Sequence, residues 1–475
     1  MYRMYFCFRN FRHTIVEVYP QKKIILNIEG QNQSIRININ MHKFPIKFIS
    51  IYLIIFFIIV SVSASVTFKI TSYNVENLFD LEHNGTEYKE YIPNSKSNWT
   101  LKTANIKYIN IGKVLTDIDA DIVALQEVES LKSLLNLRKV LKSSNTYYPY
   151  YAIASQQNST VKCAFLSKFP IINKEEIIIE GTAARSILKI KLKINNNNLF
   201  IFNNHWKSKS GPESLRIKYA EALKKGINKL TKESDYILLG DFNANYNEYI
   251  TFLKSKKLNN TQGVTGINHI LGTLNGSELI GESLVFDPQN SNNLYNLWLE
   301  LTPYKRWSYN FFGKKGSPDN IIVSKGLYNK EGISYIDNSF NKFQENYLFN
   351  NRAIYRWQTT RNRNGKHLGF GFSDHLPIYA YFTTLPFKFD SKPTILNVDT
   401  SLKKKYMKKI SKKIIDLNLA NKEQLMLIKG IGAVLADRII AQRPYKTIKK
   451  LLNVKGIGKK KLNLISPYFE INMKK

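Results

Sequence analysis

Polar residues that can bind a hard cation or move a proton directly follow or precede apolar runs at several points of this chain. They are Asn74, Glu127, His205, Asp241, Asn243, Asp319, Asp374 and His375. Carboxylate and amide oxygens are the ligands that Mg²⁺, Mn²⁺ and Ca²⁺ prefer. A carboxylate beside a histidine raises the pKa of the imidazole, and the imidazolium then stabilises charge on a reacting phosphate. These residue types predict metal-assisted hydrolysis of a phosphate ester.

The elements that must position these residues are short strands alternating with amphipathic helices. The expected strands are residues 66–71, 121–126, 150–155, 161–167, 185–194, 199–204, 235–240, 320–324 and 377–382, and the expected helices are 103–118, 130–143 and 214–230. This mixture predicts one sizeable α/β domain, with the polar residues gathered at one sheet edge. Asn195–Asn198 predicts a hairpin turn, and residues 258–304 predict a long loop or insertion.

Six short motifs occur in an order that is typical of one enzyme superfamily. They are SYNVENL, LQEVES, NNHWKS, LLGDFNA, SPDNIIVS and SDHLPI, between residues 72 and 378. Over residues 66–382 the chain resembles the endonuclease/exonuclease/phosphatase superfamily. The resemblance is close for LQEV, GDFNA and SDHLPI and looser for SPDN. It implies a four-layer α/β sandwich, with two packed mixed sheets flanked by helices and the site at one end.

The resemblance also implies a metal site. Glu127 resembles the principal Mg²⁺ ligand, and Asn74 is expected to bind the metal or a nearby phosphate oxygen. Asp374 is expected to be a further carboxylate at that site. Hard oxygen donors leave Mn²⁺ and Ca²⁺ as alternatives to Mg²⁺.

The catalytic roles follow from the same motifs. Asp241 resembles the residue that orients or deprotonates the attacking water, and Asn243 is expected to contact phosphate. His375 resembles the catalytic histidine, with Asp319 as the carboxylate that fixes its tautomer. His205 is expected to be a second histidine that donates to phosphate.

Basic residues near these motifs are less specific. Arg185 falls where relatives carry a phosphate-contacting arginine, although an exposed strand arginine is an equal reading. Lys162 stands where some relatives have an acidic partner of the second histidine. Arg361, Arg363 and Lys366 precede the SDH motif and either clamp a phosphate backbone or form a solvated loop.

The charge of the chain requires an anionic partner. The 475 residues carry 70 Lys and Arg against 36 Asp and Glu, a net charge of +34. Residues 401–475 hold 20 of the basic and 4 of the acidic residues, a net of +16. An AT-rich genome explains an abundance of lysine, but not this concentration in one segment. Such a basic segment is typical of proteins that bind nucleic acid.

The carboxyl-terminal segment contains two Gly-Ile-Gly turns between helical stretches. The turns place glycines at Gly430, Gly432, Gly456 and Gly458, and Lys455 and Lys459 flank the second turn. Glycine permits the tight turn and lets backbone N–H groups face a phosphate, which the amino end of the next helix also attracts. The segment resembles a tandem helix-hairpin-helix module of competence DNA receptors, a small all-α domain that binds DNA backbone without reading sequence. Protein–protein binding by the same fold is the alternative.

The amino terminus predicts export. Residues 48–68 carry no charge, lysines precede them, and Val62-Ser63-Ala64 provides the small residues of a cleavage site. We expect residues 41–64 to be a signal peptide or signal anchor, and residues 1–40 a leader or over-extended start. Cys7 and Cys163 are too few for a disulfide scaffold or a cysteine-based zinc site.

The sequence thus predicts a catalytic domain at residues 65–385, a basic linker at 386–413 and a DNA-binding domain at 414–475. We expect an exported, monomeric Mg²⁺-dependent DNA endonuclease that meets the membrane only through its amino-terminal apolar segment. One alternative is a secreted phospholipid or sphingomyelin phosphodiesterase, which requires an exposed apolar hairpin near the site that the sequence does not reveal. Another is a DNA receptor with a vestigial catalytic domain.

Overall fold

The structure is a computed structural model of the whole chain. It describes residues 2–8, 11–19, 23–29, 34–40, 65–156, 159–181, 184–285, 293–360, 365–389, 415–420, 422–426, 428 and 430–471.

Two mixed β-sheets form the centre of the domain that spans residues 65–389. The six-stranded sheet has the order β15 (Tyr295–Asn296), β18 (Asp319–Val323), β12 (Tyr236–Asp241), β11 (Asn197–His205), β10 (Ile187–Ile194) and β9 (Ile171–Ile177). The larger sheet has the order β19 (Ser334–Tyr335), β23 (Ile378–Thr383), β5 (Thr67–Leu78), β6 (Ile122–Val128), β8 (Lys162–Ser167) and β7 (Tyr150–Ile153), with β20 (Asn341–Lys342) also beside β23. Only β5–β6 and β11–β12 pair in parallel within these two sheets.

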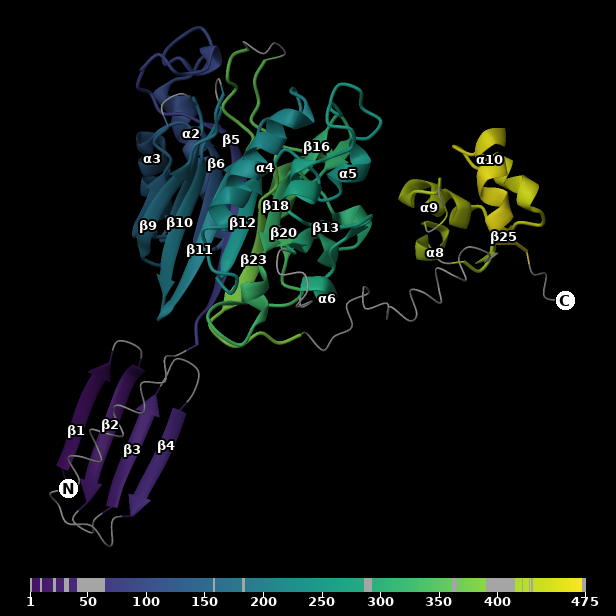
Figure 1. Ribbon diagram of the computed structural model, residues 1–475. Helices are drawn as coiled ribbons and strands as arrows, with labels where there is room; N and C mark the ends of the chain where they lie inside the picture. Colours follow the sequence, from purple (N-terminus) through teal and green to yellow (C-terminus); the bar gives the residue numbers. More distant parts are fainter. Residues whose placement is uncertain are drawn as a thin grey trace.

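Helices cover the outer faces of both sheets (Figure 1). The longer ones are α2 (Leu101–Ile118), α3 (Leu131–Ser143) and α4 (Glu213–Ile227). The shorter ones are η2 (Lys89–Tyr91), α5 (Glu248–Thr251), η3 (Gly266–Ile270), α6 (Glu282–Val285), η4 (Leu297–Glu300), η5 (Pro303–Lys305), η6 (Lys325–Tyr328) and η7 (Asn346–Leu348). A capping box starts α2, since the Thr100 side chain accepts a hydrogen bond from the Thr103 backbone N–H.

Three hydrophobic cores separate the four layers. The central core joins the inner faces of the sheets through side chains such as Ile70 of β5 and Ile237 of β12. A second core packs α2 and α3 against the larger sheet, and a third packs α4 and η3 against the smaller one. Strands alternate their side chains between two faces, so central strands such as β6 and β12 supply two cores. The expected four-layer α/β sandwich is confirmed.

The structure differs from the sequence prediction at a strand of the smaller sheet and at the expected long loop. Strand β9 was not expected, because residues 171–177 are mostly exposed or half-buried at a sheet edge and lack an apolar run. The expected long loop at residues 258–304 contains η3, the small hairpin of β13 (Leu274–Asn275) and β14 (Glu278–Leu279), and β15. Ile267 and Leu271 from this stretch are buried in the third core, so the described part of the insertion is built into the fold.

The amino-terminal residues form an antiparallel sheet of their own. It consists of β1 (Tyr2–Phe8), β2 (Phe11–Tyr19), β3 (Lys23–Glu29) and β4 (Ser34–Asn40). The predicted signal segment at residues 41–64 lies outside the described residues. Within the part of the chain that the structure describes, no helix is long and apolar enough to span a membrane.

The carboxyl-terminal residues fold around a small core of their own. The elements are α8 (Lys422–Met426), α9 (Ala433–Ala441), η8 (Ile448–Asn453), α10 (Lys459–Ile465) and η9 (Ser466–Tyr468). Strands β24 (Ile415–Asp416) and β25 (Phe469–Glu470) pair in parallel and join the two ends of the module. Ile431 and Ile457, the central residues of the two turns, are buried in this core.

Candidate active site and DNA-binding module

Strand ends from both sheets meet at one end of the sandwich. In the smaller sheet, His205 pairs with Asp241 and Asp241 pairs with Asp319, so three strands place polar residues side by side. In the larger sheet, the start of β23 lies beside the carboxyl half of β5, and the Ser373 hydroxyl donates to the Asn74 carbonyl at 2.7 Å. The structure therefore brings together all eight polar residues that the motifs singled out near this edge.

Irregular backbone turns two of these residues toward the site. Glu127 has a φ of +66° where the pairing of β6 with β8 shifts register between Leu125 and Val128. A bulge of this kind re-aims a side chain. Gly240, with a φ of +122°, precedes Asp241, and a Cβ there would lie 2.1 Å from the Asn204 carbonyl oxygen. Only glycine fits this close approach of two parallel strands.

An amide bridges two of the carboxylates. Asn74 Nδ2 donates to Glu127 Oε1 at 3.2 Å and to Asp241 Oδ2 at 3.0 Å. The second oxygen of Glu127 accepts the Asn77 backbone N–H at 3.0 Å. Burial raises the pKa of Asp241 to about 6, against the opposing effect of His375. A carboxylate with such a pKa can accept a proton near neutral pH.

His375 and Asp319 form a buried ion pair. His375 Nδ1 lies 2.8 Å from Asp319 Oδ2, and the same oxygen accepts the Ser308 hydroxyl at 2.5 Å. Burial by itself lowers the pKa of His375, but the carboxylates of Asp319, Asp374 and Asp241 together raise it well above 6.5. The other ring nitrogen, Nε2, faces Asp241 Oδ2 at 3.9 Å and Asp374 Oδ1 at 3.8 Å. An imidazolium held in this way can donate toward the centre of the site.

The pKa of the second histidine, His205, is shifted in the opposite direction to that of His375. His205 Nε2 lies 3.6 Å from Glu127 Oε1 and 3.7 Å from Asp241 Oδ2. Burial lowers the pKa of His205 well below 6.5, and the Arg185 and His375 charges lower it further. Its Nδ1 is buried and has no hydrogen-bond partner among the described residues. Lys162, at the position discussed above, donates to the Glu129 carbonyl instead.

Arg185 and Asn243 lie beside this histidine. Arg185 Nη1 and Asn243 Nδ2 both donate to the Trp206 carbonyl, each at 3.0 Å. The Asn243 backbone N–H donates to Asp241 Oδ1 at 2.8 Å. Lys366 is exposed, and its backbone N–H donates to the Thr360 hydroxyl and not to a residue of the site. Arg361 and Arg363 lie outside the described residues.

Arg356, which no sequence motif marked, joins Glu76 and Asp374 in a charged group at the edge of the site. The Arg356 guanidinium donates to Glu76 Oε1, and its Nη2 lies 3.5 Å from Asp374 Oδ2. Burial and the Asp374 charge raise the pKa of Glu76 to about 7, although Arg356 and Lys107 oppose the shift. Arg356 lies in a stretch without periodic pattern or motif, so no sequence signal marked it.

The donor set fits a hard cation. The side chains of Glu127 and Asp374 are 20% and 22% exposed, whereas the side chain of Asp241 is 3% exposed. All three offer the oxygen that Mg²⁺ requires. Among the described residues of this site, the His, Asp and Glu side chains whose ligand atoms lie within 4.8 Å of one another are Asp241, Asp319 and His375. Asn74 turns its Nδ2 toward the carboxylates, while its Oδ1 accepts the Glu76 backbone N–H.

The two Gly-Ile-Gly turns of the carboxyl-terminal module have matching geometry. Gly430 and Gly456 have φ values of +104° and +105°. Gly432 is the N-cap of α9 and Gly458 is the N-cap of α10, both extended. Lys455 and Lys459 are exposed beside the second turn, and Arg438 donates to the Lys455 carbonyl at 2.8 Å. Both turns therefore present the backbone N–H groups of a helix start, and the second turn does so next to positive charge.

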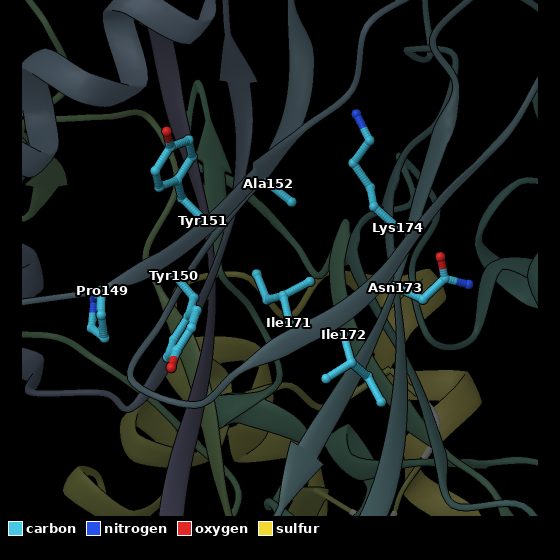
Figure 2. A pocket seen from close by; sticks show the side chains of 8 residues that line it. All are labelled: Pro149, Tyr150, Tyr151, Ala152, Ile171, Ile172, Asn173 and Lys174. Carbon is cyan, nitrogen blue, oxygen red and sulfur yellow. The ribbon is translucent and has the colours of Figure 1, made fainter.

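A separate cavity of about 480 Å³ lies between the edge strands β7 and β9 (Figure 2). It is lined by residues 149–152 and 171–174. Tyr150, which lines the cavity, pairs with Ser167 at one end of β8. The other end of β8 is Lys162, which pairs with Val128 near the site. The cavity is therefore remote from the candidate active site.

Comparisons with known proteins place the chain in a family. A family model described as "Endonuclease/Exonuclease/phosphatase family" matches residues 69–275 and 280–384, and one described as "Helix-hairpin-helix motif" matches residues 410–470. The first match spans more than half of the chain, so the chain belongs to the endonuclease/exonuclease/phosphatase family, whose fold serves phosphodiester hydrolases. A comparison with curated proteins finds no match.

Solved structures give weaker similarities. ANGEL2, "a 2',3'-cyclic phosphatase", is 18% identical, with a TM-score of 0.43, over 68% of this chain and 96% of its own. A humanized D. rerio TDP2 is 14% identical, with a TM-score of 0.40, over 66% of this chain and 98% of its own. A family member from Bacteroides thetaiotaomicron is 14% identical, with a TM-score of 0.38, over 67% and 98%. The family assignment rests on the sequence model rather than on these similarities.

Proposed function

We propose that the protein is an exported, Mg²⁺-dependent DNA endonuclease. The observation that carries this proposal is the buried His375–Asp319 pair facing Asp241 and Asp374 on a chain that also has two Gly-Ile-Gly turns. The first feature suits hydrolysis of a phosphodiester, and the second suits retention of a polynucleotide.

The geometry supports a separate chemical role for each residue of the site. Asp241, with its pKa near 6, accepts a proton from the attacking water. His375 stays protonated beside Asp319 and stabilises the charge that develops on the phosphate oxygens. Neutral His205 donates a hydrogen bond to the phosphate, and Arg185 adds positive charge on the same side. A Mg²⁺ ion held by Glu127 and Asp374 would neutralise phosphate charge.

Asn74 and Arg356 position the carboxylates. Asn74 holds Glu127 and Asp241 at a fixed separation through one amide group. Arg356 holds Asp374 next to Glu76. Such supporting contacts limit the freedom of the groups that react, which lowers the entropic part of the barrier.

The carboxyl-terminal module raises the local concentration of DNA. Its basic residues and turn amides bind the backbone without reading bases, so affinity falls as salt rises. Covalent linkage to the catalytic domain then makes each encounter of the site with DNA intramolecular.

Export rests on the sequence of the amino terminus alone. An apolar segment preceded by lysines and followed by small residues suits a signal peptide or an anchor. We therefore propose action on DNA outside the cytoplasm, by a monomer.

The proposed activity is tested with supercoiled plasmid. The full-length chain is incubated with circular and linear DNA, in Mg²⁺ and in EDTA. Nicked circles that appear in Mg²⁺ but not in EDTA support a metal-dependent endonuclease. DNA retention without nicking would favour a receptor with a vestigial site, and phospholipid hydrolysis without nicking would favour the lipid phosphodiesterase.

A further inference from the structure

An aromatic ridge rises beside the catalytic histidine on the small hairpin of β16 (Tyr309–Phe311) and β17 (Lys314–Gly316). The Tyr309 and Phe311 rings are stacked at 6.2 Å and 9°, and the Phe312 ring meets Phe311 edge-on at 4.6 Å. Phe311 is 51% exposed and Phe312 is 91% exposed. The sequence did not reveal this hairpin, because three aromatic residues in a polar stretch give no strand periodicity.

The ridge starts within the active site. The Tyr309 ring lies 4.7 Å from the His375 ring, and the backbones of these two residues form a β-bridge. The Ser308 carbonyl accepts the Leu376 backbone N–H at 2.8 Å, and the Ser308 side chain donates to Asp319. The hairpin is therefore anchored to the His375–Asp319 pair on one side and reaches into solvent on the other.

The surroundings of the ridge are positively charged. Residues 301–318 contain Lys305, Arg306, Lys314 and Lys315 and no Asp or Glu. Lys315 Nζ lies 4.3 Å from the centre of the Trp307 ring, and Lys342 Nζ lies 3.8 Å from it. Aromatic faces interleaved with cations are typical of surfaces that bind single-stranded nucleic acid.

We propose that the Tyr309–Phe312 ridge stacks an unpaired nucleobase next to the scissile phosphate. The site would then act on single-stranded or locally opened DNA in preference to closed duplex. This inference rests on the proposed function. A phosphate bound at His375 would lie next to the Tyr309 ring, and the Phe311 and Phe312 rings extend the aromatic surface outward from there. Every base has a face that can stack on such rings. This exposed hairpin is also the feature that the lipid phosphodiesterase alternative requires, so binding to lipid is an outcome that the test must separate. Two phenyl rings match the size of one or two bases.

The test uses an oligonucleotide in which phosphorothioates leave one cleavable linkage. Its matched partner lacks the two bases that flank this linkage. Full-length wild type and the F311A/F312A variant are assayed on both in Mg²⁺. The reference is the kcat/KM of the wild type on the normal strand. Removal of stacking should lower this value roughly tenfold, either in the variant on the normal strand or in the wild type on the baseless strand. For the variant, kcat/KM on the baseless strand should be close to its value on the normal strand. The base and the rings act through one contact, so removing both costs little more than removing one.

Phe389→Ala is the matched control, since this phenylalanine is 58% exposed and follows the far end of β23. It should cleave both strands like the wild type. Independent, additive losses for F311A/F312A and the baseless strand would overturn the stacking proposal, as would wild-type cleavage by F311A/F312A. A variant that loses binding to phosphatidylglycerol vesicles while cleaving DNA normally would assign the ridge to lipid instead. A wild type that cuts no DNA would refute the proposed function itself.

Discussion

The charge of Asp319 should set the pH range over which the enzyme works. Asp319→Asn keeps an oxygen that can accept from His375 Nδ1 but removes the negative charge 2.8 Å away. Because burial by itself lowers the pKa of His375, the histidine depends on its carboxylate neighbours to stay protonated. The variant should therefore lose the imidazolium, and with it activity, at a lower pH than the wild type.

The size of the effect follows from the geometry. Two unit charges 2.8 Å apart attract by roughly 6 kcal/mol at an effective dielectric constant of about 20. Part of this attraction is offset by other changes in solvation, and a neighbouring opposite charge typically shifts a pKa by about 1–3 units. We expect the alkaline limb of the kcat profile to move down by about 1–3 pH units. At neutral pH, loss of an acid in the site should lower kcat by roughly 10²- to 10⁴-fold.

The assay is the rate of plasmid nicking as a function of pH, together with NMR titration of ¹³C-labelled histidines. The chain has 7 histidines, so His375→Gln identifies the resonance. Ser308→Ala is the matched control, because it removes the other side-chain hydrogen bond to Asp319 and leaves the charge. Its alkaline limb should stay near that of the wild type. If Asp319→Asn also kept the wild-type limb, the assignment of His375 as a carboxylate-stabilised acid would be wrong.

Three further changes test other parts of the structure. Glu127→Gln should lower Mg²⁺-dependent nicking by more than roughly 100-fold, and a Mg²⁺ titration should show weaker activation; unchanged activation would contradict the metal site. Gly456→Ala places a side chain at a φ of +105°, and the strain should weaken DNA retention on filters roughly tenfold. Gly85→Ala has a similar φ, +86°, in the catalytic domain and should retain DNA normally. Burial raises the pKa of Asp235 from 3.8 to about 7, against its hydrogen bond from Ile333. Ionisation therefore costs folding free energy, by at most about 4 kcal/mol, so Tm should fall between pH 4 and 7 and Asp235→Asn should flatten that fall.

Much of the central sandwich was predictable because its strands are buried on both faces. Runs such as residues 236–239 are continuous apolar segments, and the structure buries every residue of β12. Strand β9 escaped prediction because it lies at an edge, where its exposed side chains need not be apolar. Elements of the insertion, such as η3, are stabilised by packing against α4 rather than by local pattern.

Some residues of the candidate site were predictable from the sequence and others were not. Glu127, Asp241 and His375 lie in compact motifs at strand ends, so residue type and position together marked them. Arg356 and Ser308 lie in loops, and their contacts with Asp374 and Asp319 depend on how distant segments meet. The roles of the motif residues stay predictions, while their proximity is a property of the structure.

The most direct test of the account separates cleavage from DNA binding in one chain. Wild type and His375→Ala, both full length, are compared for plasmid nicking in Mg²⁺ and for DNA retention in EDTA. We predict that His375→Ala loses nicking and retains DNA as the wild type does, because the carboxyl-terminal module folds around its own core. Nicking at the wild-type rate by His375→Ala would contradict the assigned site, and loss of retention would contradict the independence of the module.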